Sequence, residues 1–456
     1  SDSWETQGVD TDGDGGADLF LDELVEFDGT INPPDPRRKD IYVWVDWLEK
    51  TGDNAHSHKP DTEALRLVKR AFNSAPVENG GAIAGINLHI IFGNAIEETP
   101  ELETLGGFFE VRGYLPGEFS ALKKDSLQEG GERPGMSSVF HYAVFAHYLP
   151  LAVDFCPTRT DRPLGLTIPQ SNDFLIGHES LKENNRLSPL ELGGAFMHEL
   201  GHTFGLGHGG VANNETNYKP NHLSVMNYSF AKGLFYKNVG DSIPTRSILD
   251  YSRFGPEIVP DLKEGNPLNG DLIESIGLSA GQILDNYGTV YYNGLGDALG
   301  SIVYNVNNPI DWNFNGVIEP TSVNANVNKD RNDLLHRLTN VCVNNYTDLS
   351  TSNEWLGLDY TYGNIGKAMA LIEDYPAEIE LEWLDLENDL LGVVDRQIQI
   401  DIKPNNPQNT LSCVNRKGII TVAAMTTHEF DATTIDHNTV TFAGAYETHA
   451  DKKSGK

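Results

Sequence analysis

Three histidines and a glutamate close together in the sequence could carry out hydrolytic chemistry. The segment from His198 to His208 reads HELGHTFGLGH. Because His198 and His202 are four residues apart, one face of a helix would present both imidazoles to a single ion, with Glu199 beside them. Gly205 can adopt a positive φ and end that helix, which would let His208 reach the same ion. Three imidazole ligands leave the fourth position of a zinc ion for water, as in catalytic zinc sites.

The chemistry predicted from these residues is hydrolysis of a peptide bond. Zinc lowers the pKa of water towards about 7. Glu199 can accept a proton from that water and later deliver it to the leaving amine. The alternative, that the histidines only lie on a polar helix face, is disfavoured by five matched positions within eleven residues.

The pattern H-E-x-x-H-x-x-G-x-x-H resembles the signature of the metzincin zinc peptidases. The segment Ser224-Val225-Met226-Asn227-Tyr228, whose methionine is eighteen residues after His208, resembles the methionine turn of that family, in a form similar to the astacin and serralysin branches. The resemblance implies that Met226 is the apolar floor beneath the metal. It also implies that Tyr228 is a catalytic residue, as a resting metal ligand or as a hydrogen-bond donor to the oxyanion; ordinary burial is the alternative for Tyr228. No subfamily is assigned.

The fold implied by the resemblance is an α+β zincin. A twisted mixed sheet and the active-site helix would form its upper half, above a helical lower half, and the substrate would lie antiparallel to an edge strand. Our candidate for that edge strand is the segment 172–176, because it precedes the active-site helix. We therefore expect Asp173, Phe174 and Leu175 to bind substrate through main-chain pairing.

The local sequence predicts the elements that would position these residues. In the segment 39–47, Ile41, Val43 and Val45 alternate with other residues at the period of a half-buried strand. Asp61 is a suitable N-cap for a helix over 61–73, and Ser188 followed by Pro189 predicts the start of the active-site helix. Further strands are predicted at 86–92, 139–147 and 173–176.

Two loops have the spacing of calcium-binding oxygen cages. Gly15 stands at the turn position of the first loop, and Leu21 at position 12 replaces the usual glutamate. Amide oxygens replace two carboxylates in the second loop, which implies weaker affinity. The alternatives are a solvated acidic tail and an Asn-rich surface turn. The predicted ligands are Asp10, Asp12, Asp14 and Asp18 in the first loop and Asp311, Asn313, Asn315 and Glu319 in the second.

Composition divides the chain into three predicted regions. Residues 1–37 are an acidic calcium-loop extension and linker, and residues 38–395 are a metzincin-like catalytic domain with a calcium-loop insertion near 311–330. Residues 396–456 alternate apolar and polar positions and are predicted to form a small all-β module, part of a β-sandwich. A partial sandwich leaves strand edges, so self-assembly through this module is expected to be feasible.

Isolated histidines and cysteines carry weaker predictions. His56 and His58 could bind a second metal, although a pair two residues apart in a loop is more often hydrogen-bonded structure. His141, His147 and His178 are expected in strands or loops. Three cysteines are too few for a disulfide framework or a thiolate zinc site, and their pairing stays open; they are Cys156, Cys342 and Cys413.

The overall charge narrows the classes of partner. The 456 residues include 33 Lys and Arg against 66 Asp and Glu, a net charge of −33, which argues against nucleic acid as a partner. No apolar run is long enough to span a bilayer. We therefore expect a secreted, zinc-dependent endopeptidase that acts on protein or peptide substrates and also binds calcium. The alternative is a calcium-stabilised extracellular scaffold or filament subunit whose peptidase domain is vestigial or self-processing.

Overall fold

The structure is a computed structural model of the whole chain, which divides into two compact units, Ser1–Leu390 and Leu391–Lys456. Each unit is described by itself. The described residues are 2–52, 55–80, 83–98, 117–127, 135–146, 164–167, 171–177, 187–211, 214, 216–241, 243–264, 272–278, 284–292, 301–328, 348–360, 400–402, 422–424, 441–442 and 445–446.

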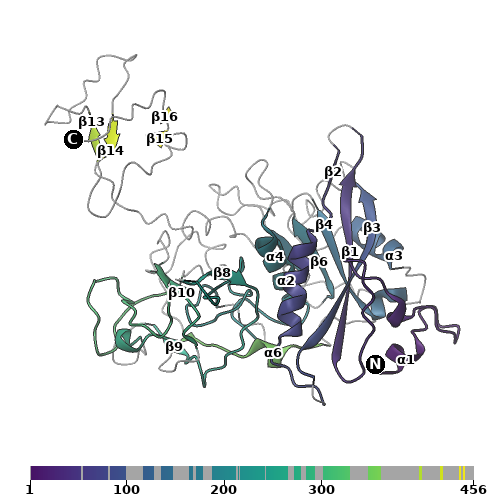
Figure 1. Cartoon of the computed structure of the whole chain (residues 1–456), viewed down its shortest axis with the longest axis horizontal. Helices are drawn as coiled ribbons and strands as arrows, with labels where there is room; N and C mark the ends of the chain where they lie inside the picture. Colours follow the sequence, from purple (N-terminus) through teal and green to yellow (C-terminus); the bar gives the residue numbers. More distant parts are fainter. Residues whose placement is uncertain are drawn as a thin grey trace. The chain divides into compact units, whose positions relative to one another are not determined.

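A six-stranded mixed sheet forms the centre of the first unit (Figure 1). Strand β1 pairs in parallel with β3 and with β4, and β4 pairs in parallel with β6. Strand β5 adds antiparallel to β6 at the end of the strand order, and β2 is a short antiparallel partner of β1. The strands are β1 (Lys39–Lys50), β2 (His56–Ser57), β3 (Ile86–Glu97), β4 (Phe140–Ala146), β5 (Gly165–Thr167) and β6 (Asp173–Gly177).

Both faces of this sheet are covered, which explains why β1 is more buried than its alternation predicted. Val43 and Val45 belong to a core cluster that also contains residues of helices α2 (Thr62–Asn73) and α4 (Pro189–His202). Tyr42 and Leu48 belong to a second cluster that contains Phe119 of helix α3 (Gly117–Ser126). Figure 1 shows α2 and α4 side by side on one side of the sheet and α3 on the other. Strands buried on both faces carry apolar residues at successive positions, so their periodicity is weak.

Two of these helices begin where their sequences predict. The Asp61 side chain accepts a hydrogen bond from the Glu63 backbone N–H at 2.7 Å, so Asp61 is the N-cap of α2. Ser188 caps α4 in a reciprocal capping box with Glu191, and Pro189 occupies the first helical position. The predicted starts of both helices are therefore confirmed.

The residues that follow α4 differ from the helical lower half that the resemblance implied. Within the described part of 203–360, the only α-helix is the single turn α6 (Glu354–Gly357); the rest consists of loops, the 3-10 turn η3 (Glu274–Ile276) and paired short strands. Glycine, proline and asparagine recur through this region and interrupt any helical period. The acidic run around Ile372–Leu391, for which the sequence also predicts a helix, lies outside the described residues. The short strands are β7 (Leu234–Tyr236), β8 (Thr245–Ile248), β9 (Leu262–Lys263), β10 (Thr289–Tyr291), β11 (Ser301–Val303) and β12 (Asp348–Leu349).

The N-terminal segment, which we expected to form an extension and linker, packs on the sheet of the first unit. It contains α1 (Asp2–Gln7) and the 3-10 turn η1 (Leu21–Glu23). Val9 and Leu21 are buried in the same cluster as Phe119, and the Phe27 backbone N–H donates to the Ile90 carbonyl of β3 at 3.0 Å. The buried apolar residues of the N-terminal segment therefore belong to the core of the first unit.

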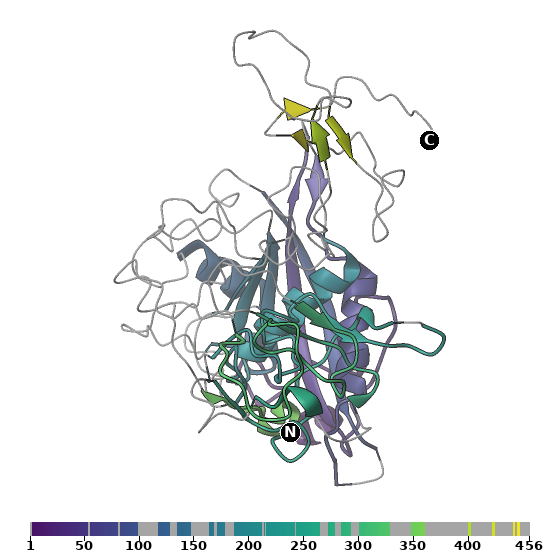
Figure 2. The same cartoon turned by 90° about the vertical axis from the view of Figure 1, so that its left-hand side faces the viewer.

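The described residues of the second unit are all in strands (Figure 2, yellow and yellow-green arrows). Strand β13 (Ile400–Ile402) pairs antiparallel with β14 (Val422–Ala424), and β15 (Thr441–Phe442) pairs antiparallel with β16 (Ala445–Tyr446). The β-sandwich stays a prediction. Among the residues described in either unit, no helix has the length and apolar character needed to cross a membrane.

Candidate metal centre

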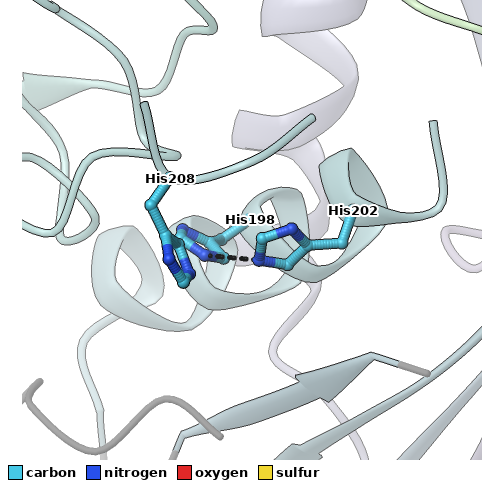
Figure 3. Close-up of side chains that lie close together, drawn as sticks. All are labelled: His198, His202 and His208. Atoms are coloured by element: carbon cyan, nitrogen blue, oxygen red, sulfur yellow. Dashed lines mark hydrogen bonds between the residues drawn. The ribbon is translucent and has the colours of Figure 1, made fainter. Parts of the chain in front are cut away.

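The three predicted zinc ligands meet on and just after helix α4. His198 and His202 lie one turn apart on the helix, and His208 comes from the loop that follows it; Figure 3 shows the three imidazoles gathered together. Gly205 has a φ of 78°, so it turns the chain after the helix as its sequence position predicts. All three side chains are buried, and their candidate ligand atoms lie within 4.8 Å of one another. The three histidines could therefore hold a metal ion.

The hydrogen bonds of His198 and His202 show that the site suits a cation. The Nδ1 atom of His198 lies 2.7 Å from the Val225 carbonyl oxygen, and that of His202 lies 2.7 Å from the Leu206 carbonyl oxygen. A carbonyl only accepts, so each Nδ1 carries a proton, and in a neutral ring the lone pair is on Nε2. The two Nε2 atoms are 3.0 Å apart. Two lone pairs at that distance repel unless a cation lies between them, and zinc is one of the ions that imidazole ligands suit.

The methionine turn lies against the same histidines. Met226 is fully buried, and a Cβ built on Gly201 of α4 would be 2.4 Å from its sulfur, so the turn and the helix are in close contact. The Val225 carbonyl of the turn holds His198 in place. The Tyr228 ring centroid is 4.5 Å from that of His208 and 5.9 Å from that of His198. Tyr228 is therefore next to the triad, as a metal ligand or oxyanion donor would need to be.

Glu199 points from α4 towards strand β5. Its Oε2 lies 2.5 Å from the hydroxyl oxygen of Thr167, which donates to it. A Cβ at Gly165 would come within 2.1 Å of its Oε1, so only glycine leaves room for this carboxylate. Neither Gly165 nor Thr167 was predicted from the sequence, because both contacts depend on the packing of β5 on the helix.

The substrate-binding prediction for Asp173, Phe174 and Leu175 needs correction. These residues form β6, which lies between β4 and β5 and is therefore an inner strand rather than an edge. Their side chains are buried, and the Asp173 carboxylate accepts a hydrogen bond from Lys123 of α3 at 2.6 Å. Within the described part of the sheet, β5 is the terminal strand beside α4. Chain order placed β6 just before the helix, but spatial order depends on strand pairing.

A buried carboxylate that was not predicted from the sequence accepts hydrogen bonds from the methionine turn and from residues next to it. Glu354 of α6 accepts hydrogen bonds from His222 Nε2 at 2.9 Å, from the Ser252 backbone N–H at 2.7 Å and from the Ser224 hydroxyl. Burial lowers the pKa of His222, which keeps its imidazole neutral as a donor. Ser224 and Glu354 are 130 residues apart, so no local pattern predicts this contact.

The acidic N-terminal loop closes on itself. The candidate ligand atoms of Asp10, Asp12 and Asp18 lie within 4.8 Å of one another, whereas Asp14 accepts from the Gly16 backbone N–H and is outside this group. Hydrogen bonds from the backbone of Gly15 and Gly13 lower the pKa of Asp10. Calcium binding here stays a prediction.

In the second predicted calcium loop, side chains also accept hydrogen bonds from the backbone of the same loop. Asp311 accepts from the backbone N–H groups of Asn315 and Gly316, at 3.1 and 2.7 Å, and Gly316 has a φ of 80°. The Asn315 amide nitrogen lies 2.7 Å from Glu319 Oε1. These contacts describe a hydrogen-bonded turn, and the role of Asn313 and its neighbours as ligands stays a prediction.

Of the other predicted residues, some lie within the described ranges and some lie outside them. His141 lies in β4 as expected; it is buried against the Phe204 ring, and burial lowers its pKa to about 3. His147 and His178 lie outside the described residues, as do Cys156, Cys342 and Cys413.

Comparison with known proteins does not place the chain in a family. No protein-family model and no curated protein matches it. Among solved structures, it is similar to archaemetzincin from Methanopyrus kandleri, with 15% identity over 40% of this chain and 84% of that one, at a TM-score of 0.22. A likeness at this level carries no functional argument, so the interpretation of the site depends on its own residues.

Proposed function

We propose that the chain is a zinc-dependent endopeptidase. The observation that carries the proposal is the pair of facing Nε2 atoms, 3.0 Å apart, whose protons are held on the opposite nitrogen by the Val225 and Leu206 carbonyls. His208 completes the set of three, and Glu199 is the neighbouring acid or base. Zinc in this site would supply Lewis-acid polarisation of the substrate carbonyl and of the attacking water.

The protein's own residues have distinct roles in this proposal. Glu199 takes the proton of the attacking water on a carboxylate oxygen and passes it to the nitrogen of the leaving amine. Thr167 donates a hydrogen bond to Oε2 of Glu199, which fixes the orientation of the carboxylate. Tyr228, beside His208, donates a hydrogen bond from its hydroxyl group to the developing oxyanion.

The substrate would bind along β5. As the terminal strand of the described sheet and the strand in contact with Glu199, β5 is the element on which an extended peptide can pair with the main chain next to the triad. This replaces β6 as the predicted substrate strand. A peptide held in this way would present one carbonyl to the metal site.

The test is the variant Glu199→Ala in the full chain. We expect its zinc content, measured by mass spectrometry after dialysis, to equal that of the wild type, because Glu199 is not a ligand. Cleavage of a peptide library should fall by about 100- to 10,000-fold, the usual contribution of general acid–base catalysis. His202→Ala should lose the zinc of the triad together with cleavage, and Glu257→Gln, an exposed carboxylate, should change neither. Undiminished cleavage by Glu199→Ala would refute the mechanism, and absence of cleavage by the wild type with zinc bound would favour the scaffold alternative.

The proposal also includes secretion of the protein and calcium binding, for which the support is less direct. They are supported by the net charge of −33 and by the converging carboxylates of Asp10, Asp12 and Asp18. Calcium at these loops would neutralise part of the excess acid.

A further inference from the structure

A second group of side chains that could bind a metal lies outside the histidine triad, at the short strand β2 and at the end of strand β3. His56 and His58 are separated by one residue, at strand β2 and just after it, and Glu98 directly follows strand β3. The Nε2 atoms of both histidines are 3.1 Å from the same oxygen, Oε2 of Glu98. All three candidate ligand atoms lie within 4.8 Å of one another.

These distances fit the geometry of a bound transition metal. With metal–nitrogen and metal–oxygen bonds of about 2.0–2.2 Å, neighbouring ligands of a tetrahedral ion are roughly 3.3–3.5 Å apart. The 3.1 Å separations in this cluster are close to that value and similar to the 3.0 Å between the two helical histidines of the triad. Two nitrogen ligands and one carboxylate are a set that zinc accepts and that calcium does not prefer.

The backbone around strand β1 brings the three side chains together. In the β1–β2 pairing, His56 is opposite Lys50, and the His58 backbone N–H donates to the Leu48 carbonyl at 2.9 Å. From the other side of β1, the Glu98 backbone N–H donates to the Glu49 carbonyl, also at 2.9 Å. The cluster is therefore held by main-chain hydrogen bonds on both sides of one strand.

Burial and charge add a reason for a cation here. The side chains of His58 and Glu98 are each only 1% exposed, whereas His56 is 26% exposed, so solvent reaches the cluster on the His56 side. A buried carboxylate is costly unless a positive group compensates it. A metal would do so, and the open side would admit a water as a further ligand. The register places Lys50 opposite His56, so protonated histidine or Lys50 is the competing source of positive charge.

We propose that His56, His58 and Glu98 form a second zinc site, which fastens the short strand β2 to the end of β3. The site is independent of the proposed peptidase activity, since it shares no residue with the triad. A bound ion would link the segment at β2 to the residue after β3, two segments that lie on opposite sides of β1.

The test measures zinc bound by the full chain after removal of metal with a chelator, reloading with zinc alone and dialysis. The wild type should retain two equivalents, His202→Ala one, Glu98→Gln one, and the double variant none. Glu97→Gln is the matched control, because the adjacent carboxylate accepts from the Thr51 hydroxyl at 2.9 Å and should leave two equivalents. His56→Ala, at the more exposed ligand, provides a second variant should Glu98→Gln fold poorly by circular dichroism.

A second measurement locates the ion. Zinc added to the metal-free His202→Ala protein should slow amide hydrogen exchange at residues 56–58 by about tenfold or more, and the same addition to the Glu98→Gln, His202→Ala protein should not. Two outcomes overturn the proposal: a His202→Ala protein that retains no zinc, and a Glu98→Gln or His56→Ala protein that still retains two equivalents. Either would assign the positive charge beside Glu98 to protonated histidine or to Lys50.

Discussion

At the scale of single residues, small side chains decide whether the proposed catalytic groups can be positioned. Gly201 leaves room for the Met226 sulfur, and Gly165 leaves room for the Glu199 carboxylate. Neither requirement concerns the conformational freedom of glycine, since both arise from what a Cβ would touch. The histidines themselves are fixed by carbonyl groups of Val225 and Leu206, which hold their tautomers.

The variant Gly165→Ala tests this at the proposed active site. Its Cβ would lie 2.1 Å from Glu199 Oε1, so the carboxylate must move, while the three histidines are untouched. Since a misplacement of about 1 Å can cost on the order of 100-fold in rate, we expect kcat/KM for peptide cleavage to fall by about 10- to 100-fold with zinc content unchanged. Gly80→Ala, where a Cβ would meet nothing within 4 Å, is the control. Equal activity of Gly165→Ala and wild type would mean that Glu199 does not need its observed position.

At the scale of elements, helix α4 with its candidate metal ligands depends on a segment far along the chain. Helix α6 supplies Glu354, whose carboxylate receives three donors from the region of the methionine turn. The methionine turn also supplies the Val225 carbonyl, which orients His198. A short helix of four residues thus contributes to the candidate metal site through the turn that orients His198.

Replacement of Glu354 by glutamine tests this link. The amide has one acceptor oxygen in place of two and brings an N–H group towards existing donors, which leaves buried groups unsatisfied. We expect the free energy of unfolding to fall by about 1–3 kcal/mol, measured by urea denaturation. The affinity for zinc should fall as well, because the Val225 carbonyl loses its support. The exposed Glu257→Gln should be within about 0.5 kcal/mol of wild type. Wild-type stability and zinc affinity in Glu354→Gln would show that the contact is incidental.

At the scale of the whole first unit, a buried charge cluster joins the N-terminal segment to the sheet and to α2. His89 of β3 lies 3.2 Å from Glu26 and 2.7 Å from Asp40, and Lys69 of α2 also contacts Glu26. Burial opposes the charge of His89, but its hydrogen bonds to Asp40 and Glu26 outweigh burial and raise its pKa above 6.5. Burial likewise opposes the charge of Glu26, but hydrogen bonds from His89 and Lys69 lower its pKa below 4.5.

The stability of this unit should therefore depend on pH in both directions. A raised histidine pKa contributes stability that is fully present below about pH 6.5 and is lost as pH rises through the pKa of the folded state. A lowered Glu26 pKa contributes stability present above its ordinary value and lost as pH falls. We expect the urea midpoint to be highest at pH values between the ordinary pKa of Glu26 and the pKa of His89 in the folded state. On the alkaline side, the free energy of unfolding should fall by about 1–3 kcal/mol. The difference in unfolding free energy between wild type and His89→Gln, measured at each pH, isolates the contribution of His89. Parallel plots of stability against pH for the two proteins would show that His89 makes no pH-dependent contribution.

The sequence by itself determined the features that depend on neighbours a few residues away. These are the histidine pair at i and i+4, the caps Asp61 and Ser188, and the turn at Gly205, since helix geometry and capping act within one or two turns. The histidine ligand set was also predicted, because two of its three members share one helix. The ligand roles of the calcium loops and the sandwich of the second unit stay predictions.

Only the tertiary structure decided which strand ends the described sheet, that Gly165 and Thr167 surround Glu199, that Glu354 supports the methionine turn, and that Glu98 meets His56 and His58. The physical reason is the same in each case. These contacts join segments whose separation in sequence is large, and they depend on strand order and register, which apolar periodicity alone does not specify when both faces of a sheet are buried.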